Sequence, residues 1–163
     1  NAAMANQISA NRELTGLMAE RMIALADKYG FPAYRAGAML LAAWARGAAS
    51  ADLVEQEIEQ AAAAGPNVQF LLGVAGDVML GAGRHDRAEA LLDRALVANE
   101  EPDVGYYLAE IWRLRGECLL ARDRANKGEA RQAFATARGV ARQQGAVIFE
   151  RRAEASLIKV AST

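Results

Sequence analysis

Proline occurs only three times in this chain of 163 residues, at Pro32, Pro66 and Pro102. The prolines are 34 and 36 residues apart, and each follows the end of an apolar helical pattern. A fixed period of about 20–50 residues is typical of repeat proteins, in which one copy cannot bury its apolar face without its neighbours. A period near 34 residues predicts helix–turn–helix units that stack into a right-handed array.

The residues between the prolines are typical of helices throughout. Ala and Leu dominate, Glu, Arg and Gln fill the polar faces, and no run of alternating β-branched residues occurs. Because the connections are short, successive helices should be antiparallel neighbours. The sequence therefore predicts an all-α fold with no sheet and seven or eight helices. The expected helices are 11–29, 32–46, 50–64, 67–82, 86–99, 103–122, 128–144 and 147–161.

These helices are expected to form one repeat domain over 11–163. Its parts are an unpaired helix at 11–29, pairs at 32–64, 67–99 and 103–144, and a last helix at 147–161. Residues 1–10 are predicted to be a tag remnant and a flexible leader, because Asn1–Ala2 is typical of an expression tag and no natural start is present. The chain is therefore interpreted as a fragment of a longer protein.

The three pairs match one another in sequence. Small positions, where two helices touch, alternate with large residues that fill the space beside them. The equivalent positions are Ala42, Gly76 and Gly116 in the first helices and Ile58, Leu92 and Phe134 in the second helices. Trp112 and Phe134 are expected in the core, whereas the pattern does not assign Trp44, Tyr106 or Tyr107.

The alternation around Gly76, Ala88 and Ala95 resembles a degenerate tetratricopeptide repeat. Four runs are similar to the C-terminal helical repeats of large bacterial signalling proteins: 81–88, 109–117, 137–146 and 150–153. Those proteins carry an adenylate or guanylate cyclase domain, or the DNA-binding domain of LuxR-type regulators, followed by a signal-transduction ATPase module. The resemblance covers nearly all of 11–161. It implies a right-handed αα-superhelix of tetratricopeptide-like repeats in the bacterial cytoplasm.

The resemblance also implies that the domain recognises a protein or peptide segment, for example another domain of its parent chain, and serves as a scaffold in signal transduction. Two other hypotheses stay open, namely sensing of a small-molecule effector and self-association or spacing. No residue is expected to be catalytic, to bind a cofactor or to ligate a metal. His85 is the only histidine, and the glycine runs lack the context of a phosphate-binding loop. The chain is therefore expected not to be an enzyme, and any cyclase or ATPase activity would lie elsewhere in the parent.

In arrays of this kind the first helix of each pair lines a groove. The predicted groove residues are Met39, Arg46, Phe70, Asp77, Leu80, Glu110, Arg113 and Glu117. They mix charge with apolar area, as a peptide-binding surface does. Asp77 and Arg113 are the expected central charges, with Arg113 holding a carboxylate of the partner, and Phe70 is expected to supply apolar contact.

Charge is distributed unevenly, although the net charge is only −1. Residues 1–104 carry 8 basic and 14 acidic side chains and residues 105–163 carry 11 and 6, which gives −6 and +5. This is interpreted as two differently solvated faces or as a gradient that orients a partner. The acidic run Asp52, Glu55, Glu57 and Glu59 is expected to be a solvated helix face. The arginines lack interleaved aromatic residues, so nucleic-acid binding is not expected.

Two further features bear on the environment of the chain. No segment approaches the roughly 18 consecutive apolar residues of a membrane span, and the single cysteine, Cys118, suits a reducing compartment and a buried position. The helix at 11–29 carries more apolar residues than one stripe requires. They are Leu14, Leu17, Met18, Met22, Ile23 and Leu25. We expect this surface to pack on an upstream repeat of the parent, or on a second copy of the fragment.

Overall fold

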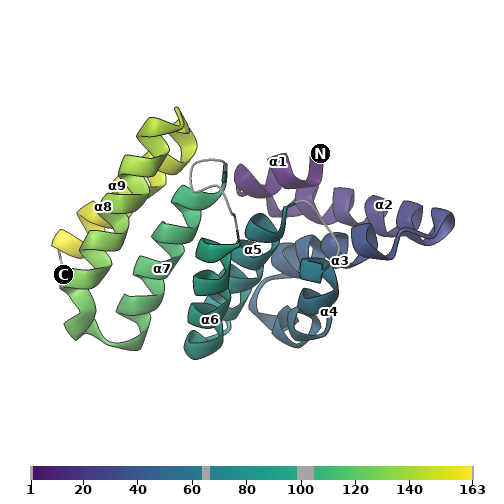
Figure 1. The fold of residues 1–163 in the computed structure, drawn as a ribbon, viewed down its shortest axis with the longest axis horizontal. Coiled ribbons are helices and arrows are strands. Elements are labelled where there is room, and N and C mark those ends of the chain that lie inside the picture. The colour runs from purple at the N-terminus through teal and green to yellow at the C-terminus, as the bar shows by residue number, and fades with distance from the viewer. Residues whose placement is uncertain (1, 64–66, 99–104, 163) are drawn as a thin grey trace.

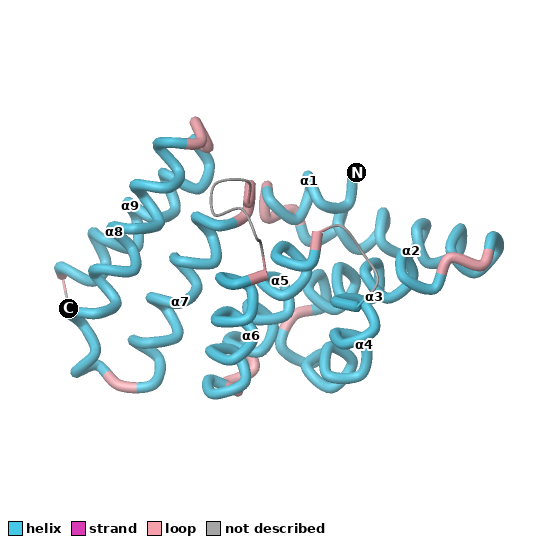
Figure 2. Tube along the Cα trace, in the orientation of Figure 1, coloured by secondary structure: helices cyan, strands magenta, loops and turns pink. Residues whose placement is uncertain are grey.

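The computed structural model describes residues 2–63, 67–98 and 105–162, and within these ranges the chain is all-α, with no strand. The described ranges form nine α-helices and two short 3-10 turns (Figures 1 and 2). The helices are α1 (Ala2–Ile8), α2 (Arg12–Tyr29), α3 (Pro32–Arg46), α4 (Ala51–Ala63), α5 (Val68–Gly81), α6 (His85–Val97), α7 (Leu108–Arg122), α8 (Lys127–Gln143) and α9 (Val147–Ala161). The turns are η1 (Ala48–Ser50) and η2 (Arg124–Asn126).

The helices follow one another in space as they do in the chain. Each helix packs on the next, and α3 also contacts α5, α5 contacts α7, and α7 contacts α9. Figure 1 shows the result as a row of helices, with α2 at one end and α8 and α9 at the other. The first helices of the predicted pairs are therefore neighbours, as a groove between them requires.

Local sequence explains where α2 ends and α3 begins. The Asn11 side chain accepts a hydrogen bond from the backbone N–H of Leu14 at 3.1 Å, which caps the first turn of α2. Gly30 ends the helix with a positive φ of 72°, a conformation that residues with a side chain rarely adopt. Pro32 then occupies the first position of α3. Proline is tolerated there because the N–H that it lacks would have no partner within the helix. Pro66 and Pro102, the other two prolines of the period, lie outside the described residues.

The described ranges contain nine α-helices and not the predicted seven or eight, and several boundaries differ from the prediction. Residues 2–8 form α1, so the expectation of a flexible leader is wrong over these residues. The fourth helix begins at Ala51, because Ala48–Ser50 forms a 3-10 turn. The helix predicted to start at residue 103 begins at Leu108, and residues 105–107 precede it as a turn.

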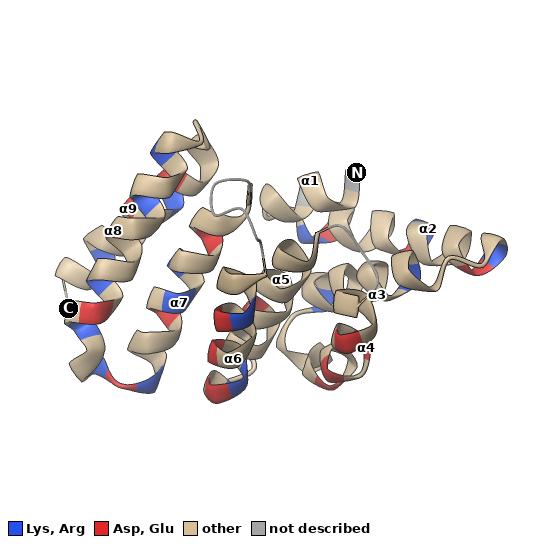
Figure 3. Cartoon of the chain, in the orientation of Figure 1, with Lys and Arg blue, Asp and Glu red and all other residues tan. Residues whose placement is uncertain are grey.

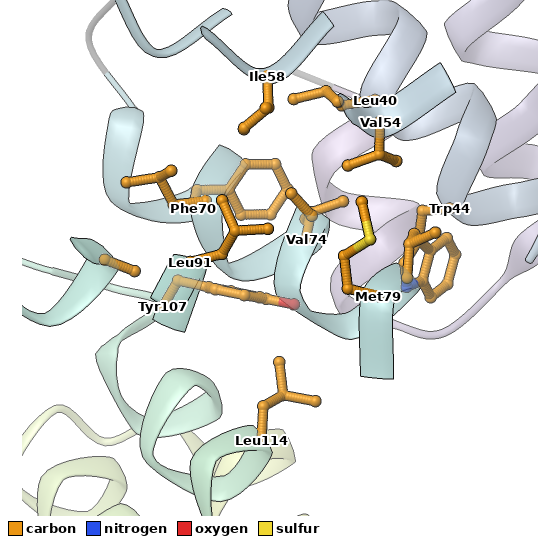
Figure 4. Close-up of a cluster of buried hydrophobic side chains, with 14 of the residues drawn as sticks. Leu40, Trp44, Val54, Ile58, Phe70, Val74, Met79, Leu91, Tyr107 and Leu114 are labelled. Carbon is orange, nitrogen blue, oxygen red and sulfur yellow. The ribbon is translucent and has the colours of Figure 1, made fainter. Parts of the chain in front are cut away.

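One large apolar core joins most of the helices. Figure 4 shows side chains from α3, α4, α5, α6 and α7 that point into it, together with Tyr107 at the start of α7. A smaller cluster of Ala130, Phe134 and Val160 joins α8 to α9. Phe134 is buried as predicted, whereas Trp112 is only half-buried. The guanidinium of Arg115 lies over the Trp112 ring, 5.5 Å from the ring centroid.

Ion pairs connect α4 to α6, where Figure 3 shows acidic positions along α4 and mixed charges along α6. Arg87 Nε donates to Glu55 at 2.9 Å, Arg94 Nη1 donates to Glu59 at 2.7 Å, and Arg84 pairs with Asp52. Glu57 has only 16% of its side chain exposed and lies 4.0 Å from Arg35. The prediction of a solvated face holds for Asp52 and Glu59, whose side chains are 82% and 63% exposed, although both pair with arginines. It is wrong for Glu57, which is mostly buried.

Candidate functional site

A hollow of about 300 Å³ lies between α5 and α7, the first helices of two successive pairs. It is lined by Asp77, Leu80, Gly81, Arg113, Leu114, Glu117 and Ala121. Four of the predicted groove residues, Asp77, Leu80, Arg113 and Glu117, therefore meet around one hollow. We call this the α5–α7 hollow.

A second hollow of about 380 Å³ continues from the first toward α9. The two hollows share Glu117 and Ala121, and the second adds Leu120, Arg124, Lys127, Lys159 and Val160. One end of the combined surface thus carries the carboxyl of Asp77, and the other end carries three basic side chains.

The remaining predicted groove residues lie elsewhere. Phe70 is only 1% exposed, and the centroid of its ring is 4.9 Å from that of Tyr107, so the prediction that it contacts a partner is wrong. Glu110 is 4% exposed and does not line the α5–α7 hollow. Met39 is half-buried and Arg46 is exposed on α3, and neither lines the α5–α7 hollow.

Arg113 is held by two carboxylates of its own helix. Its Nε and Nη2 donate to Glu110 at 3.0 and 2.9 Å, and its Nη1 donates to Glu117 at 3.4 Å. Burial alone would lower the pKa of Arg113, but the two carboxylates outweigh it and hold the pKa above its usual value. Because the guanidinium is already neutralised, Arg113 positions Glu117 at the hollow and does not offer an unpaired cation to a partner, which revises the expected role of this residue.

Two residues of α9 complete this arrangement. Arg152 Nη1 donates to Glu110 Oε1 at 2.9 Å, and Ser156 Oγ donates to Glu117 Oε1 at 2.9 Å. We refer to Glu110, Arg113, Glu117, Arg152 and Ser156 as the polar cluster. Buried charges of this kind are tolerated only when they are paired and hydrogen-bonded. The cluster therefore fixes α7 against α9 behind the hollow.

Asp77 belongs to a second polar group, which reaches back to α2. Trp44 Nε1 donates to Asp77 Oδ2 at 2.7 Å, and the guanidinium of Arg12 lies 4.4 Å from the Trp44 ring centroid and donates to the Trp44 carbonyl. Burial raises the pKa of Asp77, and the hydrogen bond from Trp44 and the charge of Arg113 offset part of the increase.

The raised pKa of Asp77 gives a pH-dependent prediction. The folded state holds the proton of Asp77 more tightly than the unfolded state does, so ionisation of this carboxyl costs stability as the pH rises through the raised pKa. Asp77→Asn keeps an acceptor for Trp44 but cannot ionise. The melting temperature of this variant should therefore increase, relative to that of the unchanged chain, as the pH rises from 3 to 7. Thermal melts across this range measure the trend. Asp93→Asn, at an exposed carboxyl, is the control, and equal trends in both variants would contradict the prediction.

The α5–α7 hollow presents paired polar side chains, with Asp77, Arg113 and Glu117 at its lining. Within residues 2–63, 67–98 and 105–162, no three His, Cys, Asp or Glu side chains are grouped as a metal site needs. His85 is the first residue of α6, and its carbonyl accepts a bond from the buried Cys118 Sγ at 3.4 Å. Among the described helices, none is both long enough and apolar enough to cross a membrane.

Comparisons with protein families, with curated proteins and with solved structures find no match to this chain. The functional interpretation therefore depends on the geometry above. Sequence reasoning did not connect Trp44, Tyr107 or Arg152 with the site. For Trp44 the signal would have been the repeat period, since Trp44 and Asp77 are 33 residues apart and occupy nearly equivalent positions in α3 and α5.

Proposed function

We propose that this chain is a non-catalytic, tetratricopeptide-like repeat module that binds a protein segment in the hollows beside α7. In this proposal it is a cytoplasmic part of a larger bacterial signalling protein, of the cyclase or ATPase-regulator type. Its partner is a separate protein or another domain of the same parent. The observation that carries the proposal is that four residues predicted to face a groove line the same hollow.

Hydrogen bonds that recur at the length of one repeat support the superhelical part of the proposal. Four side-chain pairs that join equivalent helices of neighbouring pairs are 32 to 35 residues apart. They are Trp44–Asp77 between α3 and α5, and Asp52–Arg84, Glu55–Arg87 and Glu59–Arg94 between α4 and α6 with its N-terminal cap. A constant offset is what neighbouring copies of one structural unit produce when each copy contacts only the next.

Equivalent packing in two pairs supports the same conclusion. A Cβ added at Gly76 would lie 2.9 Å from the Leu92 side chain, and one added at Gly116 would lie 2.4 Å from Phe134. These glycines occupy equivalent places in α5 and α7, and Leu92 and Phe134 occupy equivalent places in α6 and α8. In both pairs, a glycine of the first helix therefore packs closely against a large side chain of the second helix.

The shape and charge of the hollows favour a polypeptide segment as the ligand. Both hollows are open to solvent and run into each other, whereas small-molecule sites usually enclose most of their ligand. Leu80 and Leu120 supply apolar area, and Arg124 and Lys127 are exposed cations at the far end. A segment with apolar residues followed by acidic ones fits this order of groups.

A peptide selection tests this function. Peptides from a displayed library are selected on the full chain, and their dissociation constants are then measured on Ala121→Arg and Ala90→Arg. Ala121 is an exposed alanine that lines both hollows, and Ala90 is an exposed alanine of α6 that lines neither. We expect Ala121→Arg to weaken binding at least about tenfold, as loss of a central contact does, and Ala90→Arg to leave it unchanged. Selected peptides that bind both variants equally would show that the hollows are not the binding surface.

Self-association is a second candidate, which one specific feature favours. Leu14, Leu17 and Leu25 of α2 are 40%, 45% and 56% exposed, and Tyr29, Phe31 and Tyr34 extend this apolar surface to the start of α3. Met18, Met22 and Ile23, which were expected in the same surface, are half-buried against the core. Exposed apolar side chains that gather on one helix and the turn after it are typical of interaction sites.

The expected result is a dimer that depends on α2. Leu17→Glu should shift the chain toward monomer in sedimentation-velocity experiments at high concentration, because it places a charge in the middle of the apolar surface. Val97→Glu, at a 79% exposed residue of α6, is the control and should leave the mass unchanged. A chain that is monomeric at every concentration would exclude this candidate.

A further inference from the structure

The short N-terminal helix α1 is docked against the rest of the chain. It contacts α2 and α3, its Ala3 is only 1% exposed, and Met4 and Ile8 pack half-buried against the main core. A helix of seven residues is not stable by itself in water, because helix nucleation is costly. The helical state of α1 therefore depends on these contacts.

Two hydrogen bonds tie α1 to residues more than 90 positions away. Gln7 Nε2 donates to the Tyr107 hydroxyl at 2.9 Å, at the start of α7. Arg152 Nη2 of α9 donates to the carbonyl of Ile8, the last residue of α1, at 2.7 Å. A cation at this position suits the C-terminal end of a helix, where carbonyl groups lack partners within the helix.

The same contacts connect α1 to the candidate site. Arg152 bonds Ile8 with one nitrogen and Glu110 with the other, and Glu110 in turn holds Arg113 at the α5–α7 hollow. α1 thus occupies a position in which its C-terminal end is recognised by the polar cluster, as the end of a bound helix would be.

The fit of α1 is incomplete at one atom. Gln7 is 2% exposed, and its Oε1 has no hydrogen-bond partner, the one such buried side-chain atom in the part of the chain that the structure describes. An unsatisfied buried acceptor costs more than a hydrogen bond gains. A different helix that avoids this cost can therefore occupy the same position with better affinity.

We propose that α1 is a replaceable internal occupant of a helix-docking site, and that a partner helix displaces it to reach Tyr107 and Arg152. This inference deepens the proposed function and rests on it. The partner helix carries a small residue at the position of Ala3 and a hydrogen-bond donor four residues later that reaches the Tyr107 hydroxyl. It ends within one residue of that donor, so that its last carbonyl or its terminal carboxylate meets Arg152. Release of α1 then exposes Tyr107 and Arg152 to the partner helix.

The test uses the full chain and a labelled synthetic peptide with the sequence of residues 2–10. In the unchanged chain the tethered α1 competes with the peptide at an effective concentration on the order of millimolar. Ala3→Glu places a larger, charged side chain at a buried position and should release α1. Ala5→Glu makes the same change at an exposed position of α1 and should leave it docked. We expect the peptide to bind Ala3→Glu at least about tenfold more tightly than it binds Ala5→Glu or the unchanged chain.

Adding Tyr107→Phe to Ala3→Glu should weaken the peptide about two- to tenfold, the effect of one hydrogen bond. In the otherwise unchanged chain, Tyr107→Phe should accelerate hydrogen exchange of residues 2–8, with α5 and α6 unaffected. The proposal would be overturned if the peptide bound all variants equally or bound none of them. It would also be overturned if residues 2–8 exchanged hydrogen at the same rate in Tyr107→Phe as in the unchanged chain. If these tests failed but Ala121→Arg still weakened the peptides selected from the library, the proposed function would stand and only the role of α1 would be rejected.

Discussion

Replacing Gly76 with leucine should lower the free energy of unfolding by about 1–3 kcal/mol, the usual cost of overpacking a well-filled interior. Gly76 is buried in α5, and even a single added carbon at Cβ would lie 2.9 Å from Cδ2 and Cγ of Leu92. The remaining atoms of a leucine would have to enter the space that Leu92 already fills. The helices α5 and α6 must then move apart, which also displaces the helices that pack against them.

Thermal unfolding measures this effect, since about 1 kcal/mol corresponds to roughly 2–4 °C in a chain of this size. Gly81→Leu is the matched control, because Gly81 also belongs to α5 but is exposed, with no atom within 4 Å of an added Cβ. Leucine is a better helix former than glycine, so the control should melt at the same temperature as the unchanged chain or slightly higher. Equal melting temperatures for both variants would mean that α5 and α6 are not in close contact at Gly76.

Gly76 also illustrates what the sequence predicts well. Helix periodicity and the match between pairs place small residues where two helices touch, and these are local properties of the chain. The same regularity explains why Asp77 and Leu80, which the sequence placed on a groove face, lie around one hollow with Arg113 and Glu117. Spacings of three and four residues put side chains on one face of a helix whatever surrounds that helix.

Phe70 shows why part of the site was missed. It lies seven residues before Asp77, so helix geometry places it on the same face, and the sequence predicted a groove position. In the structure the turn before α7 brings Tyr106 and Tyr107 over this end of α5, with ring centroids 6.0 and 4.9 Å from that of Phe70. The covering residues come from a segment that was expected to be helical, and the path of a turn cannot be deduced from periodicity.

The helix α1 was missed for a related reason. Its seven residues contain no apolar stripe of sufficient length, and its stability comes from contacts with α2, α3, Tyr107 and Arg152. Stabilisation by tertiary contacts cannot be recognised from the helix propensity of the residues themselves. Arg152 was likewise not connected with the site, because its partners Glu110 and Ile8 are 42 and 144 positions away.

The largest effect is expected for Glu110→Ala. Glu110 is 4% exposed and accepts hydrogen bonds from both Arg113 and Arg152, so its removal leaves two guanidinium groups in a poorly hydrated position. Breaking a buried ion pair by removing one partner costs about 3–5 kcal/mol, because the remaining charge is not compensated. Chemical denaturation should therefore show this loss as a lower midpoint.

Glu59→Ala is the matched control for the same measurement. Glu59 also accepts two bonds from one arginine, Arg94, but 63% of its side chain is exposed, and such pairs contribute about 0–1 kcal/mol. Glu110→Gln adds a test of mechanism, because it keeps the volume and one acceptor while it removes the charge. If charge compensation is the cause, Glu110→Gln should lose most of the stability that Glu110→Ala loses. If Glu110→Gln were as stable as the unchanged chain, the side chain would be needed for packing, and the polar cluster would not hold α7 against α9 by its charges.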